Sequence, residues 1–328
     1  MNTTIIGDGG WGTALALVLS NNGHNVRAWG PFAENIASIQ ANGCNEAFLP
    51  GVSLPDTITW TADPEAAVKH ADLVVLAIPT QFFRAVTERF RHCMPPAATV
   101  VSVTKGLDRE THQTMTAVAA QTLACEHVAA LSGPSHAEEV ARGIPTAVVS
   151  AAQQETDRAK VQAAFNGNAF RVYTSDDVTG VQIGGALKNV IAIAVGISDG
   201  LGFGDNTRAA LITRGLVEIS RLGAALHCQP ATFAGLSGMG DLIVTCTSRH
   251  SRNRGVGERI GRGETLAQIT SGMRQVAEGV WNCDNALALA REHGVDLPIT
   301  QLVHQILHGQ IAPQLAVETL MARDTKPE

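Results

Sequence analysis

The sequence predicts an α/β protein: a Rossmann-type, doubly wound N-terminal domain over residues 1–177, followed by an all-α C-terminal domain over residues 178–328. Short β-branched or apolar runs alternate with helical segments throughout the first half, as in a parallel sheet covered by helices. This alternation stops at Val178. A glycine-rich turn also follows the first predicted strand. With 328 residues, the chain is long enough for two domains.

The first domain is expected to contain a series of strands joined by helices. The predicted strands are Thr3–Ile6, Val26–Trp29, Ile58–Thr61, Leu73–Ile78, Thr99–Val103, Val128–Leu131, Thr146–Ser150 and Phe170–Tyr173. The predicted helices lie near Trp11–Asn22, Glu34–Asn42, Asp63–His70, Gln81–Arg91, Thr111–Ala124 and Gln153–Phe165. The apolar run Leu73–Ile78 is typical of a strand buried on both faces. The segment Cys44–Pro55 is expected to be an irregular loop, because prolines and a glycine interrupt it.

The stretch Val178–Leu201 is expected to be the first helix of the second domain. It is apolar almost all the way round, which predicts a core position. Lys188 lies in its middle, on the same face as Val181, Gly184 and Ile191. Such a lysine must reach a partner or a cleft, or lose its proton. It is either a catalytic acid/base or a lysine that extends to solvent or forms a structural ion pair, and the stretch alone favours the second interpretation.

The remaining helices of the second domain follow from apolar periodicity and capping signals. A long helix is expected to begin at Asn206 or Thr207. Further helices are expected near Pro230–Ala234, Arg254–Gly261, Thr265–Thr270, Glu278–His293, Thr300–His308 and Gln314–Met321. Thr265 and Gln268 have the spacing of a capping box, and Gly294 stands where a helix-ending glycine is expected.

Composition excludes several classes of protein. The net charge of -6 argues against general nucleic-acid binding. The six cysteines are scattered without CxxC spacing, which predicts a reducing compartment and no metal site. The N-terminus lacks the pattern of a signal peptide, and Lys188 and Asp199 interrupt the most apolar run. We therefore expect a cytoplasmic protein without an integral membrane segment.

Gly7, Gly9 and Gly12 form a GxGxxG motif between a predicted strand and a predicted helix. This placement is the fingerprint of dinucleotide binding, in which glycines permit a tight turn and close approach to a pyrophosphate. Asp8 is unusual there, because an acid beside a pyrophosphate is repulsive unless it points away.

The expected partner of the fingerprint is missing. About 20 residues further on, an acid usually marks NAD and an arginine marks NADP. This chain has Gly30-Pro31-Phe32 there, and Glu34 comes slightly late. Phe32 either packs on the adenine or belongs to the core. The sequence therefore leaves the choice between NADH and NADPH open.

Two further loops follow predicted strands, where ligands of parallel sheets bind. Lys105 comes directly after Thr99–Val103 and is either an anion ligand or a surface lysine. Gly133-Pro134-Ser135 follows Val128–Leu131 and opens a short helix. Ser135 and Glu138 have capping-box spacing, and a helix N-terminus at a strand end can also bind an anion.

The second domain contains one basic segment. Arg249, Arg252 and Arg254, with Ser251 and Asn253, either hold a phosphate or form a solvated loop. Asp241, shortly before this segment, is either the partner of a buried lysine or an N-cap residue before Leu242.

Together these segments resemble the NAD(P)-dependent glycerol-3-phosphate dehydrogenase family, in particular its bacterial members. The most specific match is GGALKNVIAIAVGISDGLGFGDNTRAALITRG at Gly184–Gly215. The other matching motifs are GxGxWGTALA at Gly7–Ala16, NxxFLP at Asn45–Pro50, TKGL at Thr104–Leu107, SGPSHAEEV at Ser132–Val140, GDLIVTC at Gly240–Cys246, SRNR at Ser251–Arg254 and VAEG at Val276–Gly279. The resemblance implies reversible hydride transfer between NAD(P)H and dihydroxyacetone phosphate, giving sn-glycerol 3-phosphate for glycerophospholipids.

The resemblance also implies roles for individual residues. Lys188 is the implied general acid/base, assisted by Asn189, Asp241 and Thr245. The implied substrate contacts are Lys105, Gly133, Ser135, Lys188, Asp241, Ser251, Arg252 and Asn253, with Arg252 and Asn253 on the phosphate. The implied cofactor contacts are Gly7, Gly9, Gly10, Trp11, Gly12, Phe32, Lys105, Ala137, Arg252, Val276 and Glu278. No metal is expected, and a homodimer is possible. The chain departs from the family at Asp8, where a small residue is usual, and at Pro31-Phe32, where a basic residue is often found.

The charge of Lys188 and two alternative functions stay open at this stage. A free lysine pKa of about 10.4 is too high for a base at neutral pH. Burial and the cations Lys105 and Arg252 would lower this pKa, and Asp241 would raise it. The alternatives are a related β-hydroxyacid or ketopantoate-type dehydrogenase and a non-catalytic dinucleotide sensor.

Overall fold

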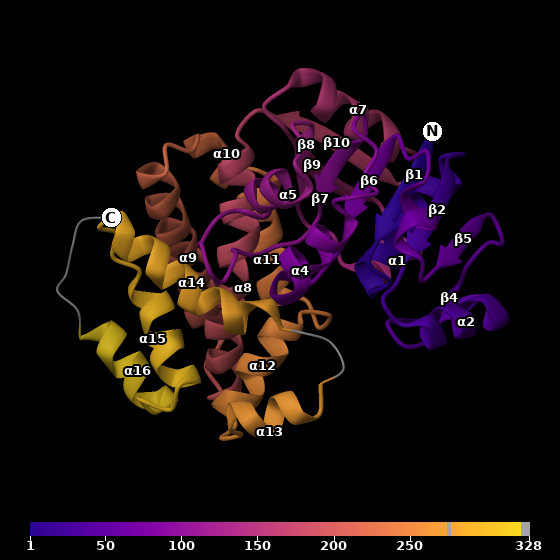
Figure 1. Cartoon of the computed structure of the whole chain (residues 1–328). Coiled ribbons are helices and arrows are strands. Elements are labelled where there is room, and N and C mark those ends of the chain that lie inside the picture. The colour runs from indigo at the N-terminus through magenta and orange to yellow at the C-terminus, as the bar shows by residue number, and fades with distance from the viewer. Residues whose placement is uncertain (274–276, 323–328) are drawn as a thin grey trace. The chain divides into compact units, whose positions relative to one another are not determined.

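The structure is a computed structural model that describes residues 1–273 and 277–322. The chain divides into two compact units, Met1–Gln182 and Ile183–Glu328. The first unit contains the large sheet, and the second is built from helices (Figure 1). The division falls within α8 (Val178–Gly200), slightly beyond the boundary expected at residue 178.

The first unit is an eight-stranded sheet with the order β10-β9-β8-β7-β6-β1-β2-β5. Its strands are β1 (Asn2–Ile6), β2 (Asn25–Trp29), β5 (Ile58–Thr61), β6 (Leu73–Leu76), β7 (Thr99–Ser102), β8 (Val128–Ser132), β9 (Thr146–Ala151) and β10 (Phe170–Ser175). Numbered along the chain, the first six follow the order 3-2-1-4-5-6 of dinucleotide-binding sheets. This confirms the predicted Rossmann-type fold. One neighbouring pair, β8 and β9, is antiparallel, because the short link through α6 (Ala137–Ala141) returns without crossing the sheet.

Helices cover both faces of this sheet. Successive strand residues point to opposite faces, so Ile5 and Ile6 of β1 enter two different apolar cores. The Ile5 core includes residues of α1 (Gly10–Asn21), α2 (Ala33–Asn42) and α7 (Glu155–Phe165). The Ile6 core includes residues of α3 (Pro64–Val68), α4 (Thr80–Phe90) and α5 (Met115–Leu123). Because helices cover both faces of the sheet, a ligand can bind only at the loops that follow the strand ends.

Three local predictions for this unit were wrong. The expected loop Cys44–Pro55 contains a small antiparallel pair, β3 (Cys44–Asn45) and β4 (Leu49–Ser53). Helix α5 begins at Met115 instead of Thr111, because the Asp108 carboxylate accepts hydrogen bonds from Thr111 N and Oγ1 and holds that segment as a turn. The capping box at Ser135 does not form. His136 precedes the first helical residue of α6, and the Ser135 hydroxyl donates to Gly133 O instead.

The second unit is all-helical. Its elements are α8, α9 (Asp205–Ala225), α10 (Pro230–Ala234), the π-helical turn η1 (Leu236–Gly240), α11 (Asp241–Thr247), α12 (Arg252–Gly261), α13 (Leu266–Ser271), α14 (Glu278–Glu292), α15 (Pro298–Leu307) and α16 (Pro313–Met321). The helices predicted from the sequence did not include η1 or α11. The capping box of Thr265 and Gln268 is confirmed, and so is the left-handed Gly294 after α14, with φ of 64°.

Helix α8 is the core helix of the second unit. It is long and apolar enough to cross a membrane by length and composition, but its most apolar 18-residue window is completely buried in the protein. Glycines let α12 pack against it at backbone distance. A Cβ atom on Gly196 would clash with Arg254 O, and one on Gly257 would clash with Ile193 O. Close backbone contacts at these glycines therefore fix the position of α12, which carries part of the basic segment, against α8.

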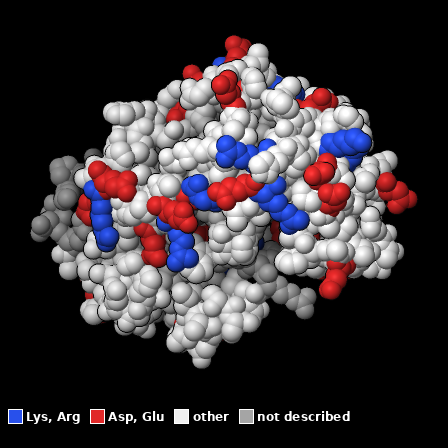
Figure 2. All heavy atoms as spheres, viewed as in Figure 1, with Lys and Arg blue, Asp and Glu red and all other residues white. Residues whose placement is uncertain are grey.

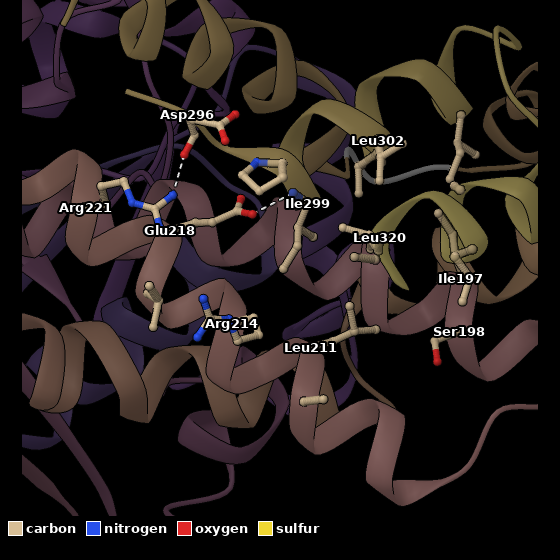
Figure 3. Close-up of a pocket in the computed structure, with 18 of the residues that line it drawn as sticks. Ile197, Ser198, Leu211, Arg214, Glu218, Arg221, Asp296, Ile299, Leu302 and Leu320 are labelled. Atoms are coloured by element: carbon tan, nitrogen blue, oxygen red, sulfur yellow. Dashed lines mark hydrogen bonds between the residues drawn. The ribbon is translucent and has the colours of Figure 1, made fainter. Parts of the chain in front are cut away.

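A buried carboxyl group joins α9 to α15. Glu218 is 3% exposed and accepts hydrogen bonds from Ile299 N, at 2.6 Å, and from Thr300 N and Oγ1, at 3.2 and 3.1 Å. It therefore caps the N-terminus of α15. Burial raises the pKa of Glu218 to about 7. Glu218 also lines an apolar cavity of about 1060 Å³ among α8, α9, α15 and α16, beside Arg221, which donates to Asp296 O (Figure 3).

Glu218 is expected to make stability fall as pH rises between about 4.5 and 7. Within this window the folded protein keeps a proton on Glu218 that the unfolded chain has released. Because the folded state binds more protons, its stability falls as pH rises. The expected loss in the free energy of unfolding is roughly 3 kcal/mol. Urea denaturation at several pH values measures it.

The matched comparison is Glu218→Gln against Glu292→Gln, an exposed glutamate of α14. Glu218→Gln should flatten the pH dependence of the free energy of unfolding, because an amide does not ionise. Equal slopes of this free energy against pH in the wild type and in Glu218→Gln would contradict the raised pKa of Glu218.

Candidate active site

Lys188 is buried and paired. Its side chain is enclosed together with Asp241 and Thr245, which are 0% and 4% exposed. Lys188 Nζ donates to the Asp241 carboxylate and, at 2.7 Å, to Thr245 Oγ1. The Thr245 hydroxyl donates to Asp241 O at 2.6 Å. The interpretation of Lys188 as a lysine that reaches solvent is therefore wrong. So is the N-cap interpretation of Asp241, which is the first residue of α11 and bonds to the lysine.

A glycine in α8 makes this pairing possible. Gly184 lies one turn before Lys188, and a Cβ atom there would lie 2.5 Å from Ser237 O. The backbone of η1 can therefore approach α8 closely. The π-helical turn then leads directly into α11 and places Asp241 beside the lysine. Turns of this kind are frequent at functional sites.

Asn189, the neighbour of Lys188, connects three helices. Asn253 Nδ2 of α12 donates to Asn189 Oδ1 at 2.9 Å, and Gly279 N of α14 donates to Asn253 Oδ1 at 2.8 Å. Both asparagines are buried. The amide of Asn253, expected on a substrate phosphate, is thus engaged with protein groups on both sides. It holds the start of α12 and the start of α14, where Glu278 is the first residue.

Within the basic segment, the arginines have different partners. Arg254 binds Asp199 of α8, with Nη2 and Oδ2 2.6 Å apart, so its charge is compensated within the protein. Ser251 caps α12 by accepting from Arg254 N at 3.2 Å. Arg252 is exposed and forms no hydrogen bond or ion pair with any residue that the structure describes. Arg252 is therefore available to an anionic ligand.

The glycine-rich loop after β1 has the shape that a dinucleotide needs. Gly7 has a φ of 122°, and a Cβ atom there would clash with Ala77 O at the end of β6. A Cβ atom on Gly12 would clash with Gly7 O. Gly9 is open, since no described atom lies within 4 Å of a Cβ built on it. Trp11 Nε1 is buried without a hydrogen-bond partner among the described residues.

The loops after β7 and β8 meet. Lys105 Nζ donates to Gly133 O at 2.9 Å and lies 3.4 Å from Ser135 Oγ. Ala137, the first residue of α6, lies beside Gly10, whose built Cβ would be 3.9 Å from that of Ala137. The residues expected from these loops are thus brought together at the strand ends. Their roles as ligand contacts are predictions.

Other expected residues have mixed outcomes, and one residue was missed. Phe32 is 63% exposed, so its interpretation as a core residue is wrong. Val276 lies outside the described residues. Asn45 was not expected at the site. It is buried, and its amide donates to Asp8 O and Thr13 Oγ1, at 2.7 and 2.8 Å, which supports the glycine loop. The only sequence signal for Asn45 was the NxxFLP motif.

Among the described residues, the cavity beside Glu218 does not carry the groups found around Lys188. Figure 2 shows acidic and basic side chains mixed over the visible face. The cavity beside Glu218 has none of Lys188, Asp241, Thr245 or Arg252 in its lining. This cavity is therefore separate from the cluster around Lys188.

Two family models match the chain. The N-terminal model of NAD-dependent glycerol-3-phosphate dehydrogenase matches residues 2–158, and the C-terminal model matches residues 177–318. A glycerol-3-phosphate dehydrogenase [NAD(P)+] of Geobacillus thermodenitrificans is 49% identical over 100% of this chain and 96% of its own length. One from Trichlorobacter lovleyi is also 49% identical, over 100% of this chain and 99% of its own.

Solved structures give the same relationship. A crystal structure of glycerol-3-phosphate dehydrogenase from Coxiella burnetii matches with a TM-score of 0.95 and 39% identity, over 98% of this chain and 99% of that one. A ketopantoate reductase from Ralstonia eutropha matches with a TM-score of 0.61 and 17% identity, over 97% of this chain and 100% of that one. The second likeness shows a common fold alone.

Proposed function

The chain belongs to the NAD-dependent glycerol-3-phosphate dehydrogenase family, and we propose that it catalyses hydride transfer between NAD(P)H and dihydroxyacetone phosphate, reversibly giving sn-glycerol 3-phosphate. The observation that carries the proposal is the buried cluster of Lys188, Asp241 and Thr245. A buried ammonium group beside a carboxylate is a proton donor with a fixed direction.

The proposed chemistry assigns a separate task to each group of the cluster. When bound, the dinucleotide supplies the hydride in reduction or accepts it in oxidation. In reduction, Lys188 donates a proton to the carbonyl oxygen of the substrate, so that C=O becomes CH–OH. Its positive charge also stabilises the developing alkoxide. Asp241 compensates the charge of the ammonium in the core, and Thr245 fixes its direction.

The remaining residues bind or position in this proposal. Arg252 binds the substrate phosphate, because its guanidinium is exposed and uncompensated among the described residues. Asn189, Ser251 and Asn253 position Arg252 and Lys188 through the bonds between α8, α12 and α14.

In the first unit, the cofactor contacts are proposed at the loop Gly7–Gly12, with Ala137 beside it. Lys105, Gly133 and Ser135 are proposed as substrate contacts at the adjoining strand ends. Phe32, exposed at the start of α2, is proposed to pack on the adenine.

The proposed physiological role is supply of the glycerophospholipid backbone in the cytoplasm. The six cysteines all lie in the described part of the chain and form no disulfide there, which suits a reducing compartment. This role follows from the reaction proposed above.

The assay is NADH and NADPH oxidation with dihydroxyacetone phosphate, followed by absorbance, in the wild type and in Lys188→Ala. The variant is expected to lose at least a thousandfold in kcat, since no other group in the cluster can donate the proton. Its affinity for the dinucleotide should stay within a few fold.

A control separates lost chemistry from lost stability. Lys188→Ala leaves the Asp241 carboxylate buried and unpaired, which costs about 3–5 kcal/mol. The double variant Lys188→Met/Asp241→Asn removes both charges and should recover stability but not turnover. Turnover within tenfold of the wild type in either variant would sink the role of Lys188. A wild type that is inactive with dihydroxyacetone phosphate would contradict the proposed function.

Arg252→Ala is expected to raise KM for dihydroxyacetone phosphate by roughly 10- to 150-fold, as for a lost charge-assisted phosphate contact of about 1.5–3 kcal/mol. KM for unphosphorylated dihydroxyacetone should change little. Arg262→Ala is the matched control, an exposed arginine at the other end of α12 that bonds to Glu258. Equal effects on both substrates would exclude phosphate recognition and favour a ketopantoate-type activity.

A further inference from the structure

Asp8, in the glycine-rich loop, lies over the backbone of Gly30. A Cβ atom built on Gly30 would lie 2.5 Å from both Cγ and Oδ2 of Asp8, so the carboxyl group fills the space of a side chain at position 30. Asn35 of α2 donates from Nδ2 to Asp8 Oδ2 at 2.7 Å. The aspartate is 5% exposed. Asp8 is therefore held at the end of β2, although it belongs to the loop after β1.

The end of β2 is where dinucleotide-binding sheets place the acid that bonds to the adenosine ribose. In this chain that position is Gly30, which has no side chain. The segment Gly30–Asn35 contains no lysine or arginine, and its single acid, Glu34, is exposed on the first turn of α2. The carboxyl group missing from β2 is thus replaced, in the same place, by that of Asp8.

We propose that Asp8 is the ribose-recognising acid of this chain and makes it prefer NADH to NADPH. The proposal rests on the proposed function, since it takes a nicotinamide dinucleotide to bind at the loop Gly7–Gly12. Asp8 accepts a hydrogen bond from the ribose 2′-hydroxyl of NADH, while Asn35 holds its other oxygen. The carboxylate also points away from the pyrophosphate site, as an acid in this loop must.

Two physical effects favour this assignment. Burial raises the pKa of Asp8, and the hydrogen bond from Asn35 opposes that rise, so each added donor stabilises the carboxylate. A ribose hydroxyl is such a donor. The 2′-phosphate of NADPH would instead bring a second negative group to the carboxylate, and no cation in Gly30–Asn35 compensates it.

The test compares kcat/KM for NADH and NADPH at saturating dihydroxyacetone phosphate. The wild type is expected to prefer NADH by at least tenfold. Asp8→Asn keeps the shape and removes the charge, and should lower this preference by tenfold or more, mainly through a lower KM for NADPH. Asp8→Ala should do the same. Glu34→Gln is the matched control and should leave the preference within about twofold.

Three results would overturn the role of Asp8: a wild type that prefers NADPH, an unchanged preference in both Asp8 variants, or a shift caused by Glu34→Gln instead. Fluorescence titration of each variant with NADH and NADPH, without substrate, gives the same comparison independently of turnover. If the wild type is inactive with both cofactors, the proposed function fails, and the titration still decides the role of Asp8.

A second, independent observation concerns a cluster of metal-ligating side chains in the second unit. Asp284 of α14 faces His304 of α15 and His308, the residue that directly follows this helix. His304 Nδ1 and His308 Nε2 lie 2.7 and 3.2 Å from the same oxygen, Asp284 Oδ1. All three ligand atoms lie within 4.8 Å of one another. The histidines are four residues apart and therefore share one face of the helix end.

We infer that this cluster binds a divalent transition metal, with Zn²⁺ as the best match. Two imidazoles and a carboxylate are a common zinc ligand set, and a water completes the tetrahedron. Ligand atoms around zinc lie about 3.3 Å apart for bonds of about 2.0–2.1 Å. The 3.2 Å between His308 Nε2 and Asp284 Oδ1 already matches this spacing, and the 2.7 Å between His304 Nδ1 and Asp284 Oδ1 must lengthen by about 0.6 Å. The expectation of no metal rested on cysteine spacing, and the spacing of His304 and His308 was not part of it.

The test titrates metal-free protein with Zn²⁺ against a chromophoric chelator. The wild type is expected to bind one Zn²⁺ more than His308→Asn and Asp284→Asn. In thermal denaturation, Zn²⁺ should raise the Tm of the wild type but not the Tm of His308→Asn or Asp284→Asn. His293→Asn, an exposed histidine between α14 and α15, is the control and should bind like the wild type. Equal zinc stoichiometry in the wild type and in His308→Asn would overturn this site.

Discussion

The second unit depends on the burial of one ion pair, Lys188 with Asp241. An ammonium group in the apolar core of α8 is tolerated only because a carboxylate and a hydroxyl contact it. This requirement extends to the backbone, since only a glycine at position 184 lets η1 come close enough to present Asp241. The position of Asp241 beside Lys188 therefore depends on how closely η1 packs against α8. A substitution that loosens η1 would also move Asp241 away from Lys188.

The first unit meets a different constraint, close approach of backbone segments at the strand ends. Gly7 and Gly12 allow β1, β6 and α1 to pack with no side chain between them. Gly30 plays the same part for Asp8, whose carboxyl group occupies the space that this glycine leaves. The two anomalies of the motif, an acid inside the loop and no acid after β2, have one explanation. The carboxyl group of Asp8 takes the place of the acid that is missing after β2.

The sequence predicted regular elements better than local contacts. Long periodic segments such as α8 and α9 and the strands of the sheet were predicted closely, because their periodicity is written in neighbouring residues. Capping spacing was misleading at Ser135 and Asp241. The Ser135 hydroxyl donates to Gly133 O, two residues before it, and does not cap α6. Asp241 pairs with Lys188, which was one of its two predicted roles, and is not the N-cap of α11. The short helix α11 was missed because its seven residues carry too little periodicity.

By itself, the sequence determined the two-part architecture, the dinucleotide loop and the candidate residues Lys188, Arg252 and Asp241. Composition, periodicity and motifs are properties of nearby residues, so they can be read along the chain. Only the tertiary structure decided which of these residues meet. The lysine and its aspartate are 53 residues apart, Asp8 lies against a residue of another strand end, and Asp284 joins histidines at the end of the next helix. Such contacts depend on how whole helices and strands pack, which no local pattern specifies.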